Sequence, residues 1–314
     1  MNIILNILIL FLGFIILIKG ADYFVDGSSK IAEYLGIPHL IIGLTIVAFG
    51  TSAPECAVSV IASIKNNSSL SISNVIGSNI CNLLLVLGAT GLFGKLECNK
   101  KVLIRDFSFM FLSYFFIFFI CIKNFLSYKN IYFISKLDGL CLLLLFVIYI
   151  LFLLFDKKDS LSKYNYKINI IDIILTLLGL IFIISGGEIV VNNASSLALS
   201  LGISNRVIGL SIVAIGTSLP ELVTSIIAII KDKKDIAIGN IIGSNIFNIF
   251  MIIGVSSLFN PLYYNLMSIL DIVIMIFSGL IVYLMFIIKK RIDLIHSIFL
   301  VSLYIIYIIY LIVK

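Results

Sequence analysis

Apolar residues occur in long runs along the whole chain, and short polar breaks separate the runs. Each run holds about 20 residues, the length that a helix needs to cross the hydrocarbon core of a bilayer. This pattern predicts an all-α integral membrane protein with ten membrane-spanning helices. The expected spans are 3–25, 38–64, 70–93, 103–122, 137–155, 168–191, 204–230, 236–258, 267–288 and 292–313.

Two of these spans, the second and the seventh, carry a polar interruption in the middle of the apolar run. Residues 43–55 read GLTIVAFGTSAPE, and residues 209–221 read GLSIVAIGTSLPE. A helix breaker beside a carboxylate is costly inside a lipid bilayer, so its presence indicates a site. Its presence twice indicates two half-sites that meet.

The two halves of the chain are copies of one unit, offset by 166 residues without a gap. Between 36–55 and 202–221, 13 of 20 positions are identical. Between 74–82 (NVIGSNICN) and 240–248 (NIIGSNIFN), 7 of 9 positions are identical. An internal repeat of this quality predicts that the halves share one fold.

Each unit holds five expected spans, an odd number, so the second copy should enter the membrane from the opposite side. Many secondary transporters are built as such inverted-topology repeats. We therefore expect a first repeat over 1–155, a short cytoplasmic link over 156–167 and a second repeat over 168–314. The first span aligns with the internal sixth span, which favours a retained helix over a cleaved leader.

Composition and charge narrow the class of protein. Hydrophobic residues make up 61% of the chain and charged residues 12%, whereas a soluble domain carries about 25% charged residues. Lysine and arginine number 15 on one side of the expected membrane and 6 on the side of the termini. The positive-inside rule then predicts a multi-pass plasma-membrane protein with both termini extracellular.

Other partners are not expected from the composition. The net charge of +6 comes from lysine and arginine in the short connections between spans, which does not indicate a nucleic-acid partner. The five cysteines form no CxxC motif and are expected to be unpaired. No cofactor and no regulatory domain are expected, and the chain is expected to act as a monomer.

The GTSxPE motif offers oxygen atoms of three kinds. Pro54 removes a backbone donor and should free carbonyls near Ala48, while Thr51, Ser52 and Glu55 add hydroxyls and a carboxylate. Hard cations prefer oxygen ligands, and Ca²⁺ takes about six to eight of them. The alternative is a simple kink with a hydrogen-bonded acid, which the second copy makes less attractive. The mirror residues are Ala214, Thr217, Ser218 and Glu221.

The GSNIxN motif places polar side chains on one helix face. Ser78 and Asn82 are four residues apart, as are Ser244 and Asn248, so each pair can complete the coordination of an ion. The alternative is helix packing through small residues and amide hydrogen bonds.

Two further pairs of residues align between the halves. Asp22 and Glu188 lie beyond the apolar cores of their spans, so solvated or capping roles are expected for them. Asn74 and Asn240 are expected at the starts of the third and eighth helices, as helix-start or gate residues.

These paired motifs resemble the two α-repeats of the cation/Ca²⁺ exchanger superfamily, in its prokaryotic sodium/calcium exchanger branch. The resemblance covers essentially the whole chain. It implies exchange of Ca²⁺ for Na⁺ by alternating access, with the ions bound as substrates and the first and sixth spans sliding as a pair. It also implies that Glu55, Glu221, Thr51 and Thr217 bind Ca²⁺. The flanking Na⁺ sites would be lined by Ala48, Ala214, Ser52, Ser218, Ser78 and Ser244.

One position departs from the family pattern. Exchangers of this type often carry an acid where Asn248 stands, so this chain has two intramembrane carboxylates and not three. Two negative charges balance one Ca²⁺ or two Na⁺, and a third Na⁺ would add an uncompensated charge in a low dielectric. Our hypothesis is an exchange closer to electroneutral, or H⁺ as the counter-ion.

Three other functions are alternatives to the sodium/calcium antiporter. A proton-coupled cation antiporter would keep the same fold and motifs. A cation channel would not need two inverted copies around one closed site. An intramembrane hydrolase using Ser52 or Ser218 would need a base, and no histidine or lysine stands near either serine. We therefore expect a transporter and not an enzyme.

Overall fold

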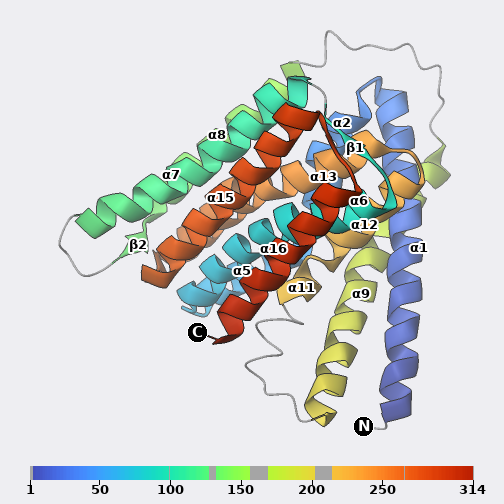
Figure 1. Cartoon of the computed structure of the whole chain (residues 1–314), viewed down its shortest axis with the longest axis horizontal. Coiled ribbons are helices and arrows are strands. Elements are labelled where there is room, and N and C mark those ends of the chain that lie inside the picture. The colour runs from blue at the N-terminus through green and yellow to red at the C-terminus, as the bar shows by residue number, and fades with distance from the viewer. Residues whose placement is uncertain are drawn as a thin grey trace.

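The computed structural model describes residues 3–98, 100–126, 132–155, 169–201, 214–264 and 266–313. These residues are mostly helical (Figure 1). The expected cytoplasmic link, 156–167, and part of the expected seventh span, 204–213, lie outside them.

The first half of the chain forms helices that several π-helical segments (η) interrupt. Its elements are α1 (Ile3–Leu35), α2 (His39–Ile42), η1 (Gly43–Val47), α3 (Ala48–Thr51), α4 (Ala53–Ile64), α5 (Ser68–Cys81), η2 (Asn82–Val86), α6 (Leu87–Phe93), β1 (Leu96–Glu97), η3 (Val102–Asp106), α7 (Phe107–Leu126), β2 (Phe133–Ile134) and α8 (Lys136–Phe155).

The second half repeats this order. Its described elements are α9 (Ile170–Ser200), α11 (Ala214–Thr217), α12 (Leu219–Ile230), α13 (Lys234–Phe247), η6 (Asn248–Ile253), α14 (Gly254–Phe259), β3 (Leu262–Tyr263), α15 (Leu266–Lys289), β4 (Arg291–Ile292) and α16 (Leu294–Val313). The all-α expectation describes the bulk of the fold, but the four two-residue strands were not predicted.

Eight helices among the described residues are long and apolar enough to cross a membrane: Leu5–Leu35, Ser68–Phe93, Val102–Ile122, Lys136–Phe155, Ile170–Ser200, Lys234–Phe259, Ser268–Lys289 and Leu294–Ile312. The helices His39–Thr51 and Ala53–Ile64, which meet at a bend of 49°, make a ninth span when they are counted together. The expected seventh span, 204–230, is described only in part and contains the short apolar helix Leu219–Ile230.

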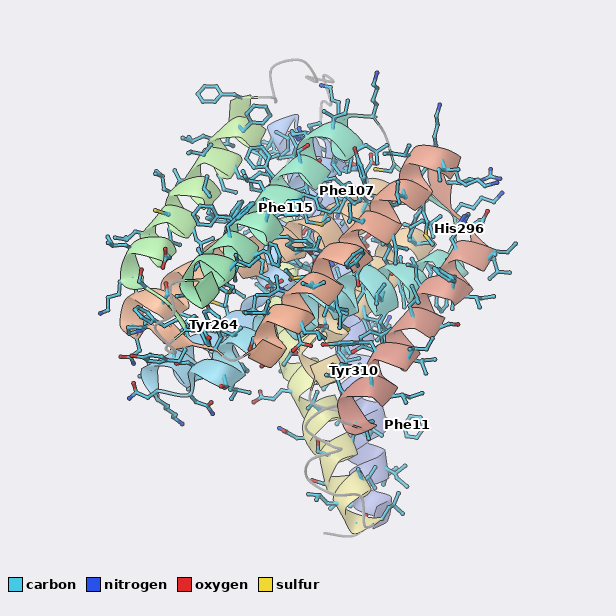
Figure 2. All side chains as sticks on the ribbon, turned by 60° about the vertical axis from the view of Figure 1, so that its left-hand side comes forward. Phe11, Phe107, Phe115, Tyr264, His296 and Tyr310 are labelled. Atoms are coloured by element: carbon cyan, nitrogen blue, oxygen red, sulfur yellow. The ribbon has the colours of Figure 1, made fainter. Side chains whose placement is uncertain are left out.

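The distribution of side chains is that of a protein surrounded by lipid. Large apolar residues cover the outside, and Phe11 on α1 projects outward (Figure 2). Serine, threonine, asparagine and two glutamates lie inside with no exposed surface. Soluble proteins keep such polar groups mostly at the surface. The interior here is therefore where a polar site has to be found.

Helices α1 and α9 lie side by side along most of their length (Figure 1). Glycines set seven residues apart on each helix allow the backbones to touch. A methyl group on Gly20 would come within 2.7 Å of the Ile183 backbone nitrogen, and one on Gly186 within 2.6 Å of the Leu17 nitrogen. Small residues at a helix interface permit this close approach.

Strand pairs join the two halves at two places. Strand β1 pairs antiparallel with β4, with Leu96 opposite Ile292, and β2 pairs antiparallel with β3, with Ile134 opposite Leu262. Each pair takes one strand from each half. Leu96, Ile292, Ile134 and Leu262 are all buried, so the pairs are part of the core.

The segment from α2 to α3 crosses α13 at backbone distance. A methyl group on Gly239 would lie 2.7 Å from the Leu40 carbonyl oxygen, and one on Gly243 would lie 2.7 Å from the Leu44 carbonyl oxygen. This contact brings the first GTSxPE segment against the helix that carries the second GSNIxN motif.

We expect Gly186→Ala to destabilise the protein, because its methyl group would clash with the α1 backbone. Overpacking of this kind costs about 1–3 kcal/mol. Gly187→Ala is the matched control, since its methyl group would come no closer than 3.7 Å to Pro220 and alanine favours helix over glycine. Thermal unfolding in detergent compares the two. Equal melting temperatures would contradict the close α1–α9 contact.

Candidate functional site

Both GTSxPE segments break their helix at the serine. Ser52 separates α3 from α4 with φ −84° and ψ 8°, and Ser218 separates α11 from α12 with φ −90° and ψ 6°. Pro54 and Pro220 lie in the first turn of the following helix, where a missing N–H breaks no helical hydrogen bond. The expected interruptions are therefore present in both halves.

Gly50 lies within α3 and allows a close approach of α1. A methyl group there would come within 2.8 Å of the Phe24 ring. Gly216 similarly faces Val191 on α9. Both glycines therefore make room for side chains of α1 and α9.

Glu55 and Glu221 are the only carboxylates that these segments carry, and each is fully buried in the first turn of its helix. The Ser52 hydroxyl donates to Glu221 Oε1 at 2.7 Å, and the Ser218 hydroxyl donates to Glu55 Oε1 at 3.3 Å. Each serine thus binds the glutamate of the other half. The two half-sites meet, as the sequence predicted.

The second motif contributes to the same two carboxylates. The Ser78 hydroxyl donates to Glu55 Oε1 at 3.4 Å, and the Ser244 hydroxyl donates to Glu221 Oε1 at 3.5 Å. Each Oε1 therefore accepts two serine hydroxyls, one from each half. Every contact of this set has a counterpart 166 residues away, which is the pattern of a two-fold relation.

Four buried oxygen atoms at this place have no hydrogen-bond partner among the described residues. They are Glu55 Oε2, Glu221 Oε2, Asn82 Oδ1 and Asn248 Oδ1. Asn82 Nδ2 is also unpartnered, whereas Asn248 Nδ2 donates to Asn79 Oδ1 at 2.9 Å. Buried polar atoms without partners cost about 1–3 kcal/mol each. Their presence together indicates a place for a ligand.

Asn82 and Asn248 also mark a change in the helix. Each begins a π-helical segment, η2 and η6, after a regular α-helix. Such π-bulges occur frequently at functional sites because they re-aim side chains within a helix.

The site combines two carboxyl groups with hydroxyl and amide oxygens. In the described ranges no lysine, arginine or histidine pairs with Glu55 or Glu221. Among the described residues, no three or more His, Cys, Asp or Glu side chains lie close enough together to hold a metal ion. Two carboxylates with hydroxyl and amide oxygens suit a hard cation, and a soft metal would require thiolate or imidazole ligands.

The remaining candidate residues are less symmetric. The Thr51 hydroxyl donates to Asn240 Oδ1 at 2.9 Å and lies 3.4 Å from the Ala48 carbonyl. Contrary to expectation, Pro54 does not free that carbonyl, because Pro54 lies in the first turn of the next helix and the Ser52 N–H donates to the Ala48 oxygen at 3.1 Å. Thr217 is only half-buried and lines a cavity. Ala214 begins α11.

Two asparagines support the glutamate backbones, contrary to the expectation that they begin helices. Asn74 lies within α5 and donates to the Glu55 carbonyl at 3.2 Å, and Asn240 lies within α13 and donates to the Glu221 carbonyl at 3.4 Å. Both also donate to a serine one turn further on, Ser59 and Ser225. Their identity in both repeats was the available signal.

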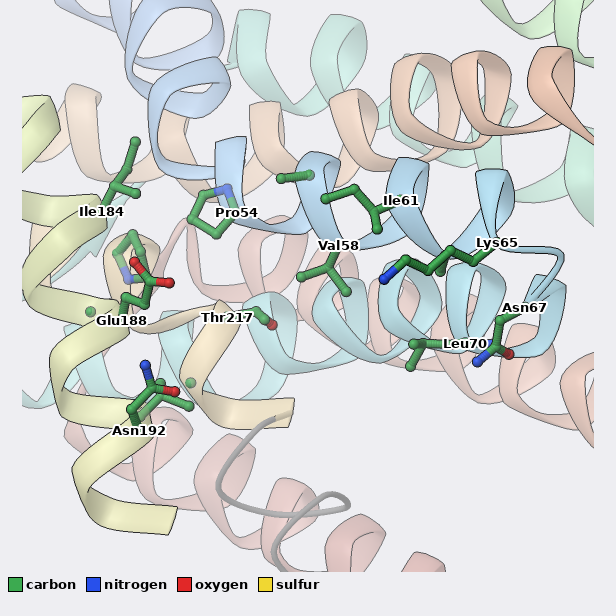
Figure 3. A pocket seen from close by; sticks show the side chains of 16 residues that line it. Pro54, Val58, Ile61, Lys65, Asn67, Leu70, Ile184, Glu188, Asn192 and Thr217 are labelled. Atoms are coloured by element: carbon green, nitrogen blue, oxygen red, sulfur yellow. The ribbon is translucent and has the colours of Figure 1, made fainter. Parts of the chain in front are cut away.

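A cavity of about 760 Å³ leads toward the site from one end of the molecule. It separates α4 from α9 (Figure 3). Its walls extend from Lys65 and Asn67 to Thr217 and Pro220. The second GTSxPE segment can therefore be reached from this end.

Known proteins are similar to this chain in sequence and in fold. The family model described as sodium/calcium exchanger protein matches residues 5–155 and 171–313. The sodium/calcium exchanger MaX1 of Methanosarcina acetivorans is 35% identical over 298 residues, covering 82% of this chain and 84% of its own. The putative antiporter CaxA of Alkalimonas amylolytica is 36% identical over 260 residues, with 79% of each chain covered.

Among solved structures, the sodium-calcium exchanger NCX_Mj superposes with a TM-score of 0.83 at 34% identity, covering 98% of this chain and 99% of that one. The family match spans nearly the whole sequence, and the structural match includes both halves. The chain is a multi-pass membrane protein that belongs to the sodium/calcium exchanger family.

Proposed function

We propose that this protein exchanges Ca²⁺ for Na⁺ across the plasma membrane as a secondary antiporter. The observation that carries the proposal is the pair of fully buried glutamates, each bound by serines of both halves and each with one unpartnered oxygen. A buried carboxylate pair without a basic partner needs cations or protons to balance it. The relatives MaX1 and NCX_Mj are both sodium/calcium exchangers, which supports the same pair of ions.

The proposed Ca²⁺ ligands lie at the centre of the site. Glu55 and Glu221 supply carboxylate oxygens, Thr51 and Thr217 supply hydroxyl oxygens, and Asn82 and Asn248 extend the set. Serine hydroxyls from both motifs, with the Ala48 and Ala214 carbonyls, form the flanking Na⁺ sites. The serines are Ser52, Ser78, Ser218 and Ser244.

We further propose ten spans in two inverted five-helix repeats, divided at 156–167, with both termini extracellular. The reciprocal contacts at the site support this arrangement. The strand pairs β1–β4 and β2–β3 also support it, because each pair joins one strand of the first half to one strand of the second. We propose that the chain works as a monomer. A central site that a cavity reaches from one end supports alternating access.

The charge of the site bears on the coupling. With Asn248 in place of an acid, two carboxylates balance one Ca²⁺ or two Na⁺. A further Na⁺ would bring an uncompensated charge into a low dielectric. We propose that exchange is close to electroneutral. The second candidate, an H⁺-coupled antiporter, rests on the same carboxylates, because either one can take a proton in place of Na⁺.

Transport into vesicles separates these functions. We expect Ca²⁺ uptake by purified protein with an imposed Na⁺ gradient, and at least a ten-fold loss in Glu55→Gln and Glu221→Gln, because each removes one of the two buried charges. Glu97→Gln, at an exposed glutamate of β1, is the control. Uptake that follows an H⁺ gradient favours the second candidate. Uptake without any counter-ion would indicate a channel and defeat the antiporter proposal.

The variant Asn82→Leu tests whether the Asn82 side chain is a ligand of the Ca²⁺ ion. We expect Asn82→Leu to raise the melting temperature in ion-free detergent, because a buried polar group without a partner is removed, and to reduce the further rise that Ca²⁺ produces. Asn6→Leu is the matched control, since Asn6 Oδ1 is also buried and unpartnered but lies on α1. An unchanged Ca²⁺ response in Asn82→Leu would remove Asn82 from the ligand set.

Asn248→Asp tests the charge argument. A third carboxylate can balance a third monovalent cation, so we expect Ca²⁺ flux in vesicles to become dependent on membrane potential, while flux in the unmodified protein changes less than about two-fold under a potential of 100 mV. Moving one charge across such a potential is worth about 2.3 kcal/mol. A strongly potential-dependent flux in the unmodified protein would rule out electroneutral exchange and leave the Ca²⁺ site in place.

A further inference from the structure

An ion pair joins α12 to α1 at one end of the molecule. Lys231, which follows α12, places its Nζ 2.6 Å from Asp22 Oδ1 and 2.7 Å from Asp26 Oδ2, and donates to the Asp22 carbonyl at 3.1 Å. Partial burial opposes the charge on this lysine, but the hydrogen bonds and charges of the two aspartates outweigh it and raise the pKa of Lys231. Next to this ion pair, α12 packs against α1.

The equivalent positions of the other half, 166 residues away, lie at the other end of the molecule, and there the lysine is separated from its two counterparts. Lys65 corresponds to Lys231, Glu188 to Asp22 and Asn192 to Asp26. Lys65 follows α4, while Glu188 and Asn192 project from α9 on the opposite wall of the 760 Å³ cavity (Figure 3). Over the residues that the structure describes, Lys65 and Glu188 make no ion pair with each other.

Lys65 and Lys231 have the same local backbone structure. The two ends of the molecule therefore differ in the distance between helices and not in the conformation around the lysine. Each lysine ends its helix and is followed by a residue with positive φ, Asn66 at 59° and Asp232 at 57°. A lysine at a helix C-terminus is also favoured there by the helix dipole. Only the separation differs: α12 contacts α1, whereas the cavity lies between α4 and α9.

Helices α1 and α9 are held together as one body. Their glycines bring the backbones into contact, and Lys30 Nζ of α1 lies 2.7 Å from Asp172 Oδ1 of α9. If the pair moves relative to α4 and α12, a shift that brings Glu188 toward Lys65 also moves Asp22 and Asp26, and it takes them away from Lys231. The two ends then close in alternation.

We infer that these residues form two alternate latches. Lys231 with Asp22 and Asp26 holds one entrance closed in the state described here, and Lys65 with Glu188 and Asn192 closes the opposite entrance in the other state. This inference rests on the proposed alternating access. The first latch has two carboxylates and the second has one carboxylate and one amide, so the described state is the favoured one.

Cysteine accessibility measures which entrance is open. Val58 lines the cavity, and its counterpart Thr224 on α12 is fully buried. We expect Lys231→Gln to slow labelling of Val58→Cys by a membrane-impermeant maleimide and to speed labelling of Thr224→Cys from the other face. Each change should be roughly two- to ten-fold, because the lysine has two partners and a partly exposed ion pair typically accounts for up to about five-fold. Adding Lys65→Gln should restore the original rates.

Two variants that keep a positive charge at position 231 test the same inference if Lys231→Gln folds poorly. Asn192→Asp gives the second latch the composition of the first, so we expect slower labelling of Val58→Cys with Lys231 intact. Lys231→Arg keeps the charge and should leave both rates unchanged. Lys234→Gln is the matched control, since its partner Asp232 is 87% exposed and lies outside both latches.

The outcomes separate this inference from the proposed function. Unchanged labelling at both reporters in Lys231→Gln and in Asn192→Asp, with Ca²⁺ exchange intact, would overturn the latches and leave the antiporter. Opposite shifts at the two reporters without any Ca²⁺ exchange would support the latches and overturn the ion assignment. Shifts of the same sign at both reporters would indicate general loosening and also overturn the latches.

Discussion

The structure depends on two carboxylates that lie in an apolar interior, where none of the described lysine, arginine or histidine residues pairs with them. Glu55 and Glu221 are fully buried, and their Oε1 atoms are held by serines of both halves while their Oε2 atoms have no partner within the described ranges. Unbalanced buried charge is expensive. The protein therefore supports it with broken helices, with Asn74 and Asn240 on the neighbouring carbonyls, and with a surrounding apolar shell.

The duplication explains why so much of this site could be predicted. A polar motif that recurs in an apolar chain at an offset of 166 has to meet its copy, and Ser52, Ser218, Ser78 and Ser244 do converge on the two glutamates. The helical spans followed from apolar length alone. For the serine contacts with the two glutamates, the repeat carried enough information to predict that the motifs meet.

Other features were missed. Asn74 and Asn240 repeat, but hydropathy does not say where a helix starts, so they were expected at the starts of helices and lie instead within α5 and α13. Two-residue strands are too short to leave a pattern. Tyr114, whose hydroxyl donates to Asn245 Oδ1 at 2.6 Å, has no such counterpart in the other half. The difference between the two ends also escapes the sequence, because it lies in the distance between helices.

The placement of the two glutamates has a consequence for how an ion would experience the membrane field. Glu55 and Glu221 belong to α4 and α12, and neither belongs to the α1–α9 pair. If the pair slides, the bound cation stays at one depth while the wall around it moves. The charges that the wall itself carries, Asp22, Asp26 and Glu188 among them, then move with it, and their electrical work adds to that of the cargo as its access changes from one side of the membrane to the other.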